Sequence, residues 1–288
     1  PVTGWECVYV HREKKLFVSV YVDDFKLAGL KKNLRPMIKV LSAKIDLGDA
    51  MPLHGDVYLG CKQENIAPPL ELLKQKSDLY NMIVKDDIPD PDILWLGNAD
   101  NIKAWQYDMT GHVKQTVERY CELAKVKSST LKEVSTPSLD DHLIPQEDFE
   151  KPGILADESA KIVLKALWPA RIGRPEILWA VNTLARNVTK WTKADDKRLL
   201  RLISYMWHTK HHVQVCYVGD KLEDCVLMLF VDASFAAEQQ HSKSTSGCFL
   251  ALVGPNTFVP LSWFVKKQGA VTHSSSESEF LALDAGLR

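Results

Sequence analysis

The sequence predicts an α+β fold, and three observations support this. Residues 5–29 alternate short apolar runs with polar breaks, which is typical of a β-meander. Residues 111–208 mostly carry apolar side chains at helical spacing, and residues 225–288 return to strand-like runs that end in a helical pattern. No repeat of fixed period is present, which argues against a solenoid.

Composition indicates a globular chain with a sizeable core. Of 288 residues, 45% are apolar and 25% are charged, and the net charge is -1. A protein this close to neutral can meet a polyanion only through local positive patches. The six cysteines form no CxxC pair, so we expect free thiols in a reducing compartment.

The first elements follow from the spacing of apolar residues. Strands are expected in WECVYV, LFVSVYV and FKLAG, and a helix over residues 30–47, before a short strand in DVYLGCKQ. Residues 64–106 are largely polar, with the Pro- and Asp-rich centre KDDIPDPDILWLGNAD, and are expected to be a loop or insertion. No stretch approaches the ~20 apolar residues of a membrane span. The first residues show neither a start methionine nor signal or transit character, so a chain that opens on Pro1 is expected to be a fragment or a processed or trimmed piece.

Helices dominate the middle of the chain. They are expected at 111–126, at 156–187 with a break at Arg174-Pro175, and at 194–208. Between them, residues 134–155 are rich in Pro, Asp and Ser, and we expect a surface linker and a subdomain boundary there. Then CVLMLFVDASF predicts a buried strand, CFLALVGPNTFVPLSWFV a hairpin, and SSSESEFLALDAG a helix.

Two adjacent aspartates, Asp23 and Asp24, interrupt an apolar run. Asp is common in hairpin turns, so a solvated turn is one interpretation. A divalent cation is the other, because carboxylate oxygens suit Mg²⁺ and two such ions can drive phosphoryl transfer.

A second acidic set lies near the end of the chain. Asp232 ends an apolar strand, and Glu277 and Glu279 begin a helix. A capping box formed by Ser274 with Glu277, or by Ser276 with Glu279, needs no chemistry. Alternatively, a strand Asp and a helix Glu could face each other as metal ligands of a nuclease.

Several motifs resemble one protein family. Tyr21-Val22-Asp23-Asp24 resembles the YVDD box of reverse transcriptases, and FVSVYVDDFKLAG, KIDLGDA and YLGCKQ follow the order found in copia-type long-terminal-repeat retrotransposons. VDASFAA, SKSTSGC, LSWFVKKQ and HSSSESEF resemble the ribonuclease H part of the same polyproteins. The resemblance implies Asp23, Asp24, Asp232 and Glu277 as catalytic metal ligands, with Glu277 preferred over Glu279 and Mg²⁺ or Mn²⁺ as cofactor.

The resemblance also implies a domain order. Residues 1–133 would be the late palm and thumb of a reverse transcriptase with a polar insertion at about 64–106, 134–155 a linker, and 156–215 a helical connection. Residues 222–288 would be the N-terminal half of a ribonuclease H-like domain, with a mixed sheet and a helix. The family needs a further carboxylate before the YVDD box and another after the last helix; neither is matched, so we expect the isolated chain to be inactive.

Implied partners are an RNA template, a DNA primer, an RNA/DNA hybrid and the rest of the polyprotein, in a cytoplasmic virus-like particle or the nucleus. A non-catalytic remnant that binds nucleic acid is the alternative function, and a solvated face is the alternative role for the basic side chains. The side chains that could track a phosphate backbone are Lys197, Arg198, Arg201, Lys243, Lys266 and Lys267.

Overall fold

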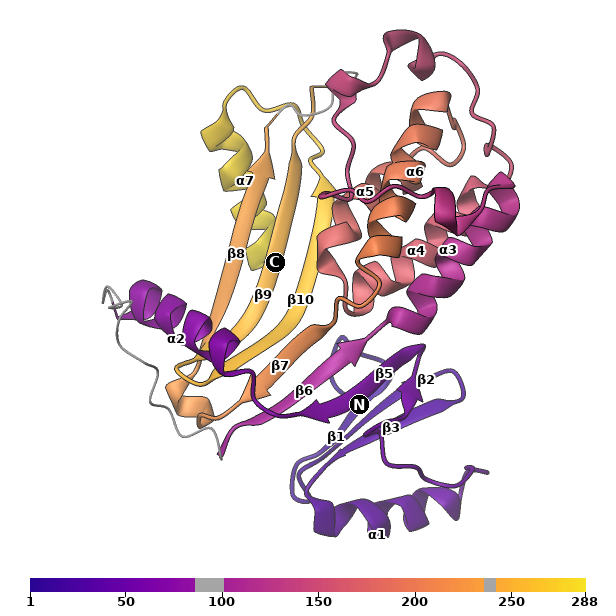
Figure 1. Ribbon diagram of the computed structural model, residues 1–288. Coiled ribbons are helices and arrows are strands. Elements are labelled where there is room, and N and C mark those ends of the chain that lie inside the picture. Colours follow the sequence, from indigo (N-terminus) through magenta and orange to yellow (C-terminus); the bar gives the residue numbers. More distant parts are fainter. Residues whose placement is uncertain (86–100, 236–241) are drawn as a thin grey trace. The chain divides into compact units, whose positions relative to one another are not determined.

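The computed structural model describes residues 1–85, 101–235 and 242–288 and divides into two compact units (Figure 1). The units are Pro1–Tyr58 and Leu59–Arg288. Both are built from helices and antiparallel strands, which confirms the α+β class. The unit boundary follows Tyr58, whereas the sequence placed a boundary within residues 134–155. Within the described ranges, we find no helix with the length and apolarity that a membrane crossing requires.

The first unit is a three-stranded meander with one helix. Strands β1 (Val8–His11), β2 (Leu16–Tyr21) and β3 (Asp24–Gly29) pair in sequence order, and α1 (Lys31–Ser42) follows before the short β4 (Val57–Tyr58). The β-branched and aromatic residues of the strands and the helical spacing of α1 predicted these elements.

Gly29 allows α1 to leave the sheet at a sharp angle. Its φ is +145°, and a Cβ at this position would lie 2.3 Å from the carbonyl oxygen of Lys15. Only glycine tolerates this backbone conformation together with so close an approach.

Burial is sparse in this unit. Leu16 is its one buried hydrophobic residue, at 3% exposure. Large apolar side chains on both faces of the meander, such as Tyr9 and Phe17, are more than one-third exposed. A three-stranded sheet with so little buried apolar surface gains little stability from its own packing.

The second unit is built on a larger sheet. Its strands are β5 (Cys61–Ile66), β6 (Lys103–Asp108), β7 (Gln214–Val218), β8 (Val226–Ser234), β9 (Thr245–Gly254) and β10 (Thr257–Lys267). They lie in the order β5-β6-β7-β10-β9-β8, and every described pair is antiparallel. The expected mixed sheet is therefore corrected: hairpins join β8 to β9 and β9 to β10, and a parallel pair needs a crossover connection instead.

Four helices form the main core of the second unit. They are α3 (Thr110–Ala124), α4 (Ser159–Ile172), α5 (Leu178–Ala185) and α6 (Lys193–His208), and fully buried side chains such as Val113, Ile162 and Ile203 pack between them. The expected break falls where Pro175 starts a short 3₁₀ turn between α4 and α5. The last helix, α7 (Ser275–Leu287), packs on β8 and β9 (Figure 1).

Residues 64–106 are not simply a loop. The helix α2 (Leu70–Val84) lies in this segment and buries Leu73 and Tyr80 in a second core with residues of β8, β9 and β10. The stretches on either side of this helix are polar, so the composition of the whole segment predicted a loop and not a helix. The Pro- and Asp-rich centre, 86–100, lies outside the described residues.

The segment 134–155 is packed rather than a loose surface linker. Ile144 and Asp148 are buried, and short 3₁₀ turns form at Asp141–Leu143 and Gln146–Phe149. A composition rich in Pro and Asp predicts irregular backbone, but only the fold shows that α6 supplies cations that hold these acidic side chains.

Candidate functional site

Asp23 and Asp24 lie at the tip of the β2–β3 hairpin. Tyr21 and Asp24 are the last paired residues, and Val22 and Asp23 form the turn, with Val22 in the left-handed region at φ 55°. Asp23 and Asp24 are exposed, and Val22 is 85% exposed. The turn interpretation is therefore right about the backbone, and both aspartates are exposed.

The charge of Asp24 at this tip affects the pKa of Tyr58. Its ring is half-buried, and burial raises the pKa of its phenol, which the negative charge of Asp24 raises further. The same ring has the ammonium of Lys26 above it, 5.4 Å from the centroid. The sequence offered no signal for this neighbour, because Tyr58 lies 34 positions after Asp24.

Asp232 and Glu277 are found near one end of the large sheet. Asp232 pairs with Gly247, and the next row, Ala233 with Ser246, is tied to the start of α7 through Gln268. Gln268 Nε2 donates to Ser246 Oγ at 3.0 Å and to the carbonyl of Ser278 at 2.8 Å.

Helix α7 packs on one face of this sheet. A Cβ on Gly286 of α7 would lie 3.0 Å from Leu229 and 3.4 Å from Val231, so α7 covers the face of these residues. Side chains alternate along a strand, and Asp232 therefore points from the opposite face. The pairing of Asp232 with Glu277 stays a prediction.

Glu277 takes part in the hydrogen bonds at the start of α7. Its backbone N–H donates to Ser274 Oγ at 3.1 Å, and its carboxylate accepts from the N–H of His273 at 2.6 Å. This arrangement satisfies donors at the start of α7 without a metal. Glu279 of the same turn is half-buried, so neither glutamate is singled out as a ligand.

The described residues contain no group of three or more His, Cys, Asp or Glu side chains that could hold a metal ion. Each predicted site thus contributes two carboxylates at most. Two-metal phosphoryl transfer needs a larger oxygen set.

The predicted phosphate-binding side chains of α6 already have partners within the chain. Lys197 pairs with Asp148 at 2.5 Å, Arg198 pairs with Asp195 at 2.9 Å, and Arg201 Nε donates to the carbonyl of Thr136 at 2.9 Å. Lys193 also pairs with Asp148, at 2.9 Å, and the hydrogen bond from Lys197, followed by that from Lys193, lowers the pKa of Asp148.

The other predicted cations lie on the large sheet and its loops. Lys243 Nζ donates to the carbonyl of Gly269 at 2.6 Å, and Lys267 has its own contact within the chain. Lys266 is exposed on β10.

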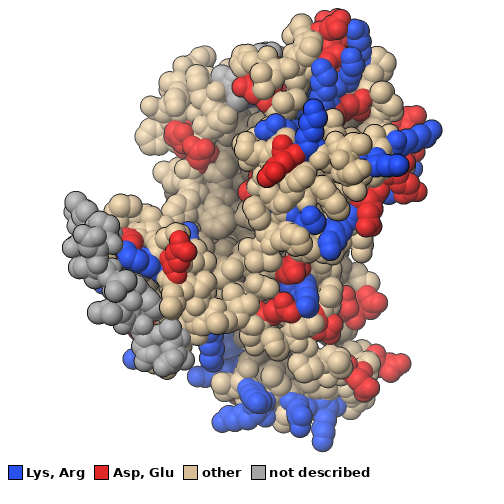
Figure 2. Space-filling view, in the orientation of Figure 1, with Lys and Arg blue, Asp and Glu red and all other residues tan. Residues whose placement is uncertain are grey.

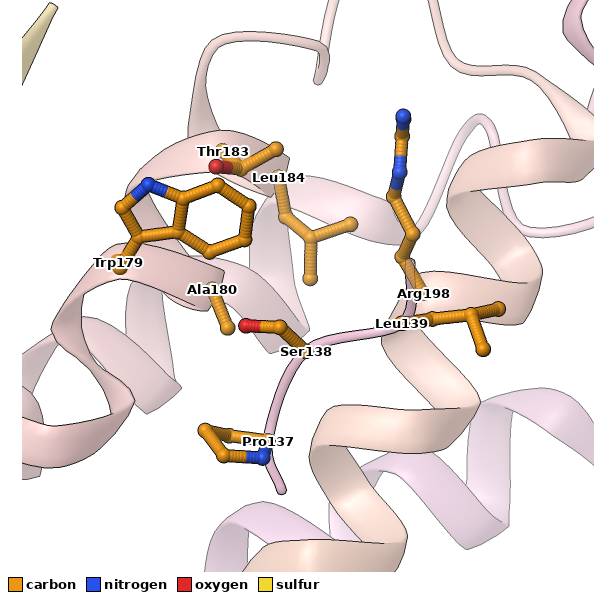
Figure 3. Close-up of a pocket in the computed structure, with 8 residues that line it drawn as sticks. All are labelled: Pro137, Ser138, Leu139, Trp179, Ala180, Thr183, Leu184 and Arg198. Atoms are coloured by element: carbon orange, nitrogen blue, oxygen red, sulfur yellow. The ribbon is translucent and has the colours of Figure 1, made fainter. Parts of the chain in front are cut away.

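A narrow, mostly apolar pocket lies between the segment 137–139 and α5 (Figure 3). The guanidinium of Arg198, which lines it, is engaged by Asp141 and Asp195. The pocket therefore offers no free charge for an anionic ligand. Its lining residues are Pro137, Ser138, Leu139, Trp179, Ala180, Thr183, Leu184 and Arg198.

One group of cations was missed by the sequence interpretation. Lys31, Lys32 and Arg35 lie exposed on α1 and have no ion-pair partner among the described residues. The available signal was the complete absence of Asp and Glu between Phe25 and Ile45, a stretch that holds six Lys and Arg residues.

Comparison with known proteins gives three informative matches, all from Arabidopsis thaliana. The chain is 31% identical over 121 residues to the "Uncharacterized mitochondrial protein AtMg00810", covering 42% of this chain and 48% of that protein. It is 28% identical over 159 residues to the "Retrovirus-related Pol polyprotein from transposon RE1", and equally to that from transposon RE2, covering 55% of this chain and 10% of each polyprotein. No family model and no solved structure matches.

These matches confirm the resemblance to copia-type retrotransposon polyproteins and support a retroelement-derived fragment. The matched region spans about half of the mitochondrial protein and a tenth of each transposon polyprotein.

Proposed function

We propose that this chain is the part of a retrotransposon polyprotein that contributes one arm of a reverse-transcriptase metal site and one part of a ribonuclease H, and that the chain alone is inactive. The observation that carries the proposal is the exposed carboxylate pair Asp23 and Asp24 at the tip of a tight antiparallel hairpin. The similarity to the Pol polyproteins supports it.

The hairpin tip has the chemistry of a half-site. Asp23 and Asp24 would hold Mg²⁺ or Mn²⁺, which supplies charge neutralisation for phosphoryl transfer when bound. Two adjacent carboxylates in open solvent bind such ions weakly, with a Kd on the order of millimolar or above. The remaining oxygen ligands have to come from other protein or from the nucleic acid.

The sparse burial of the first unit fits this assignment. A meander that leaves apolar side chains exposed on both faces is an unfinished packing arrangement. We assign these faces to contact with further polyprotein sequence.

Asp232 and Glu277 are the corresponding nuclease candidates. Asp232 lies near the end of β8, and Glu277 lies in the first turn of α7, where its carboxylate accepts from the N–H of His273. We propose that Asp232 is a ligand in the complete protein and that Glu277 has to release the N–H of His273 to join it.

Partners under this proposal are an RNA template, a DNA primer and their hybrid, inside a cell that carries the element. A second candidate function is a non-catalytic remnant that still binds nucleic acid. The observation that favours it is the lack of a third carboxylate beside either pair among the described residues.

Two activity assays on the 288-residue chain test the proposal. Primer extension on an RNA template with Mg²⁺, and cleavage of an RNA/DNA hybrid with Mn²⁺, are both expected to stay at background. Extension that disappears in Asp23→Asn would show a working polymerase site and contradict the inactive assignment.

Metal binding gives a positive readout. Mn²⁺ should broaden the amide NMR signals of the hairpin tip, and Asp23→Asn combined with Asp24→Asn should abolish this broadening. Broadening that survives both substitutions, or its absence in the unaltered chain, would remove the tip as a metal site.

A further inference from the structure

The first unit carries a cluster of cations at the end of its sheet opposite the Asp23 and Asp24 tip. The cluster, here called the α1 basic surface, consists of Lys14, Lys15, Lys31, Lys32 and Arg35. The first two lie in the β1–β2 turn and the others lie on α1. In Figure 2, blue side chains gather over α1 at the bottom of the view.

Two hydrogen bonds to backbone carbonyls of the turn hold the turn and the start of the helix together. The N–H of Leu30 donates to the carbonyl of Lys15 at 3.4 Å, and Asn33 Nδ2 donates to the carbonyl of Lys14 at 2.7 Å. Gly29 also packs closely against the turn, since a Cβ there would lie 2.3 Å from the carbonyl oxygen of Lys15. The cations are therefore clustered by the fold and not only by sequence.

None of these five cations forms an ion pair among the described residues, although Glu13 lies in the same turn as Lys14 and Lys15. All five side chains are exposed, and none takes part in an ion pair, whereas each predicted cation of α6 has a partner. The first turn of α1 contains no acidic residue, and no side chain caps it. The helix dipole is positive at this end, so it adds to the repulsion between the lysines. Repulsion between these like charges lowers the stability of the free protein, and their positive potential attracts anions.

The shape of the surface favours an extended polyanion. The exposed side of α1 carries a row of cations at intervals of four residues. The row consists of Lys31 and Arg35 of the α1 basic surface and the neighbouring Lys39, and it is about 12 Å long. A nucleic-acid duplex presents on the order of seven phosphate charges over this length. A single phosphate would use only one end of the row.

The opposite side of α1 argues against a lipid surface. Leu34, Met37 and Leu41 are half-buried, and the helix packs on β3. Helices that lie on membranes bury their apolar side in the lipid. In α1 that side is used by the protein, and the exposed side is predominantly cationic.

We propose that the α1 basic surface binds the phosphate backbone of a nucleic-acid duplex. This inference rests on the proposed function, since that function supplies the duplex. It places the sequence-independent contact on the first unit and not on α6, where the sequence predicted it.

Binding of a fluorescent RNA/DNA hybrid, measured by anisotropy over a range of salt concentrations, tests the inference. The test variant carries Lys31→Gln, Lys32→Gln and Arg35→Gln, since glutamine preserves helix propensity. The control variant carries Lys114→Gln, Lys127→Gln and Lys132→Gln, which remove the same charge from exposed positions of the second unit. A third variant, with Lys31→Arg, Lys32→Arg and Arg35→Lys, keeps the charge.

We expect the test variant to bind the RNA/DNA hybrid at least tenfold more weakly than the control variant does. Its slope of log affinity against log salt should also fall by up to about 3, the share of three phosphate contacts. The charge-preserving variant should bind like the unaltered chain, and circular dichroism should show that α1 remains helical in the test variant.

Three results would overturn the proposed role of the α1 basic surface, each in a different way. Equal affinities of the test and control variants would refute the α1 basic surface and leave the proposed function standing. No salt-sensitive binding by the unaltered chain would refute both. Tighter binding to phosphatidylserine vesicles than to the hybrid, lost in the test variant, would assign the surface to lipid and refute the duplex.

Discussion

Asp195, in the first turn of α6, is the side chain whose loss should destabilise the second unit most clearly. It is 1% exposed. Its carboxylate accepts from the N–H of Thr192 at 3.0 Å and from Thr192 Oγ1 at 2.9 Å, which completes a capping box. It also accepts from Asn187 Nδ2 at 2.9 Å and pairs with Arg198 at 2.9 Å.

The substitution Asp195→Ala removes all of these contacts. Loss of the cap costs about 1 kcal/mol. Loss of the hydrogen bond from Asn187 to a charged acceptor costs about 1.5 to 3 kcal/mol, because it leaves a half-buried donor without this partner. Relief of carboxylate burial offsets part of this, and Arg198 keeps Asp141, so the net loss of unfolding free energy should be about 3 kcal/mol.

Thermal unfolding followed by circular dichroism measures this loss. For a unit of this size, about 3 kcal/mol corresponds to a fall in Tm of roughly 6 to 12 °C. Asp195→Asn retains one acceptor oxygen and should lose less. Asp157→Ala, at an exposed position, is the matched control. If Asp195→Ala and the control unfold within about 0.5 kcal/mol of each other, the assigned hydrogen bonds contribute nothing net and the reasoning fails.

Three further predictions concern ionisation. Two lysines of α6 lower the pKa of Asp148, so its contribution to stability is present above about pH 3.9 and is lost as the pH falls through the lowered folded value. In Asp148→Asn the stability should therefore fall less steeply as the pH is lowered, which an acid titration followed by tryptophan fluorescence measures. The same pH dependence in Asp148→Asn and the unaltered chain would contradict the ion pairs. Asp24→Asn should lower the pKa of Tyr58, read as phenolate absorbance relative to Tyr58→Phe, and an unchanged pKa would separate the two residues. Burial raises the pKa of Cys216 to about 12, so at pH 8 about one thiol in ten thousand is ionised. A disulfide reagent should therefore label the exposed Cys7 far faster than Cys216. Equal labelling rates would show that the core opens.

Local structure was largely predictable. The meander, the helix break at Pro175 and the β9–β10 hairpin depend on residue spacing, β-branched residues and proline geometry, which act over a few positions. The strand β7 was missed because its partners β6 and β10 are far away in the sequence, and five residues carry little periodic signal. The helix α2 was missed because it lies between polar, proline-containing stretches in a segment that is largely polar as a whole.

The candidate site was predictable in identity but not in arrangement. Spacing and resemblance selected Asp23, Asp24, Asp232 and Glu277, and the structure places the first two on one hairpin tip. Which face Asp232 occupies, and whether the Glu277 carboxylate is already bound to His273, depend on strand register and helix position.

Charge gives the clearest division between what the sequence determined and what the fold decided. The sequence alone determined where cations occur, on α6 and on α1 alike, and it determined the hairpin that displays two carboxylates. Only the tertiary structure decided which cations form ion pairs, because it folds Asp141 and Asp148 onto α6, whereas the first turn of α1 contains no acidic residue. The physical reason is that Coulomb interactions and desolvation depend on distance in space, and residues 50 positions apart become neighbours only when the chain has packed.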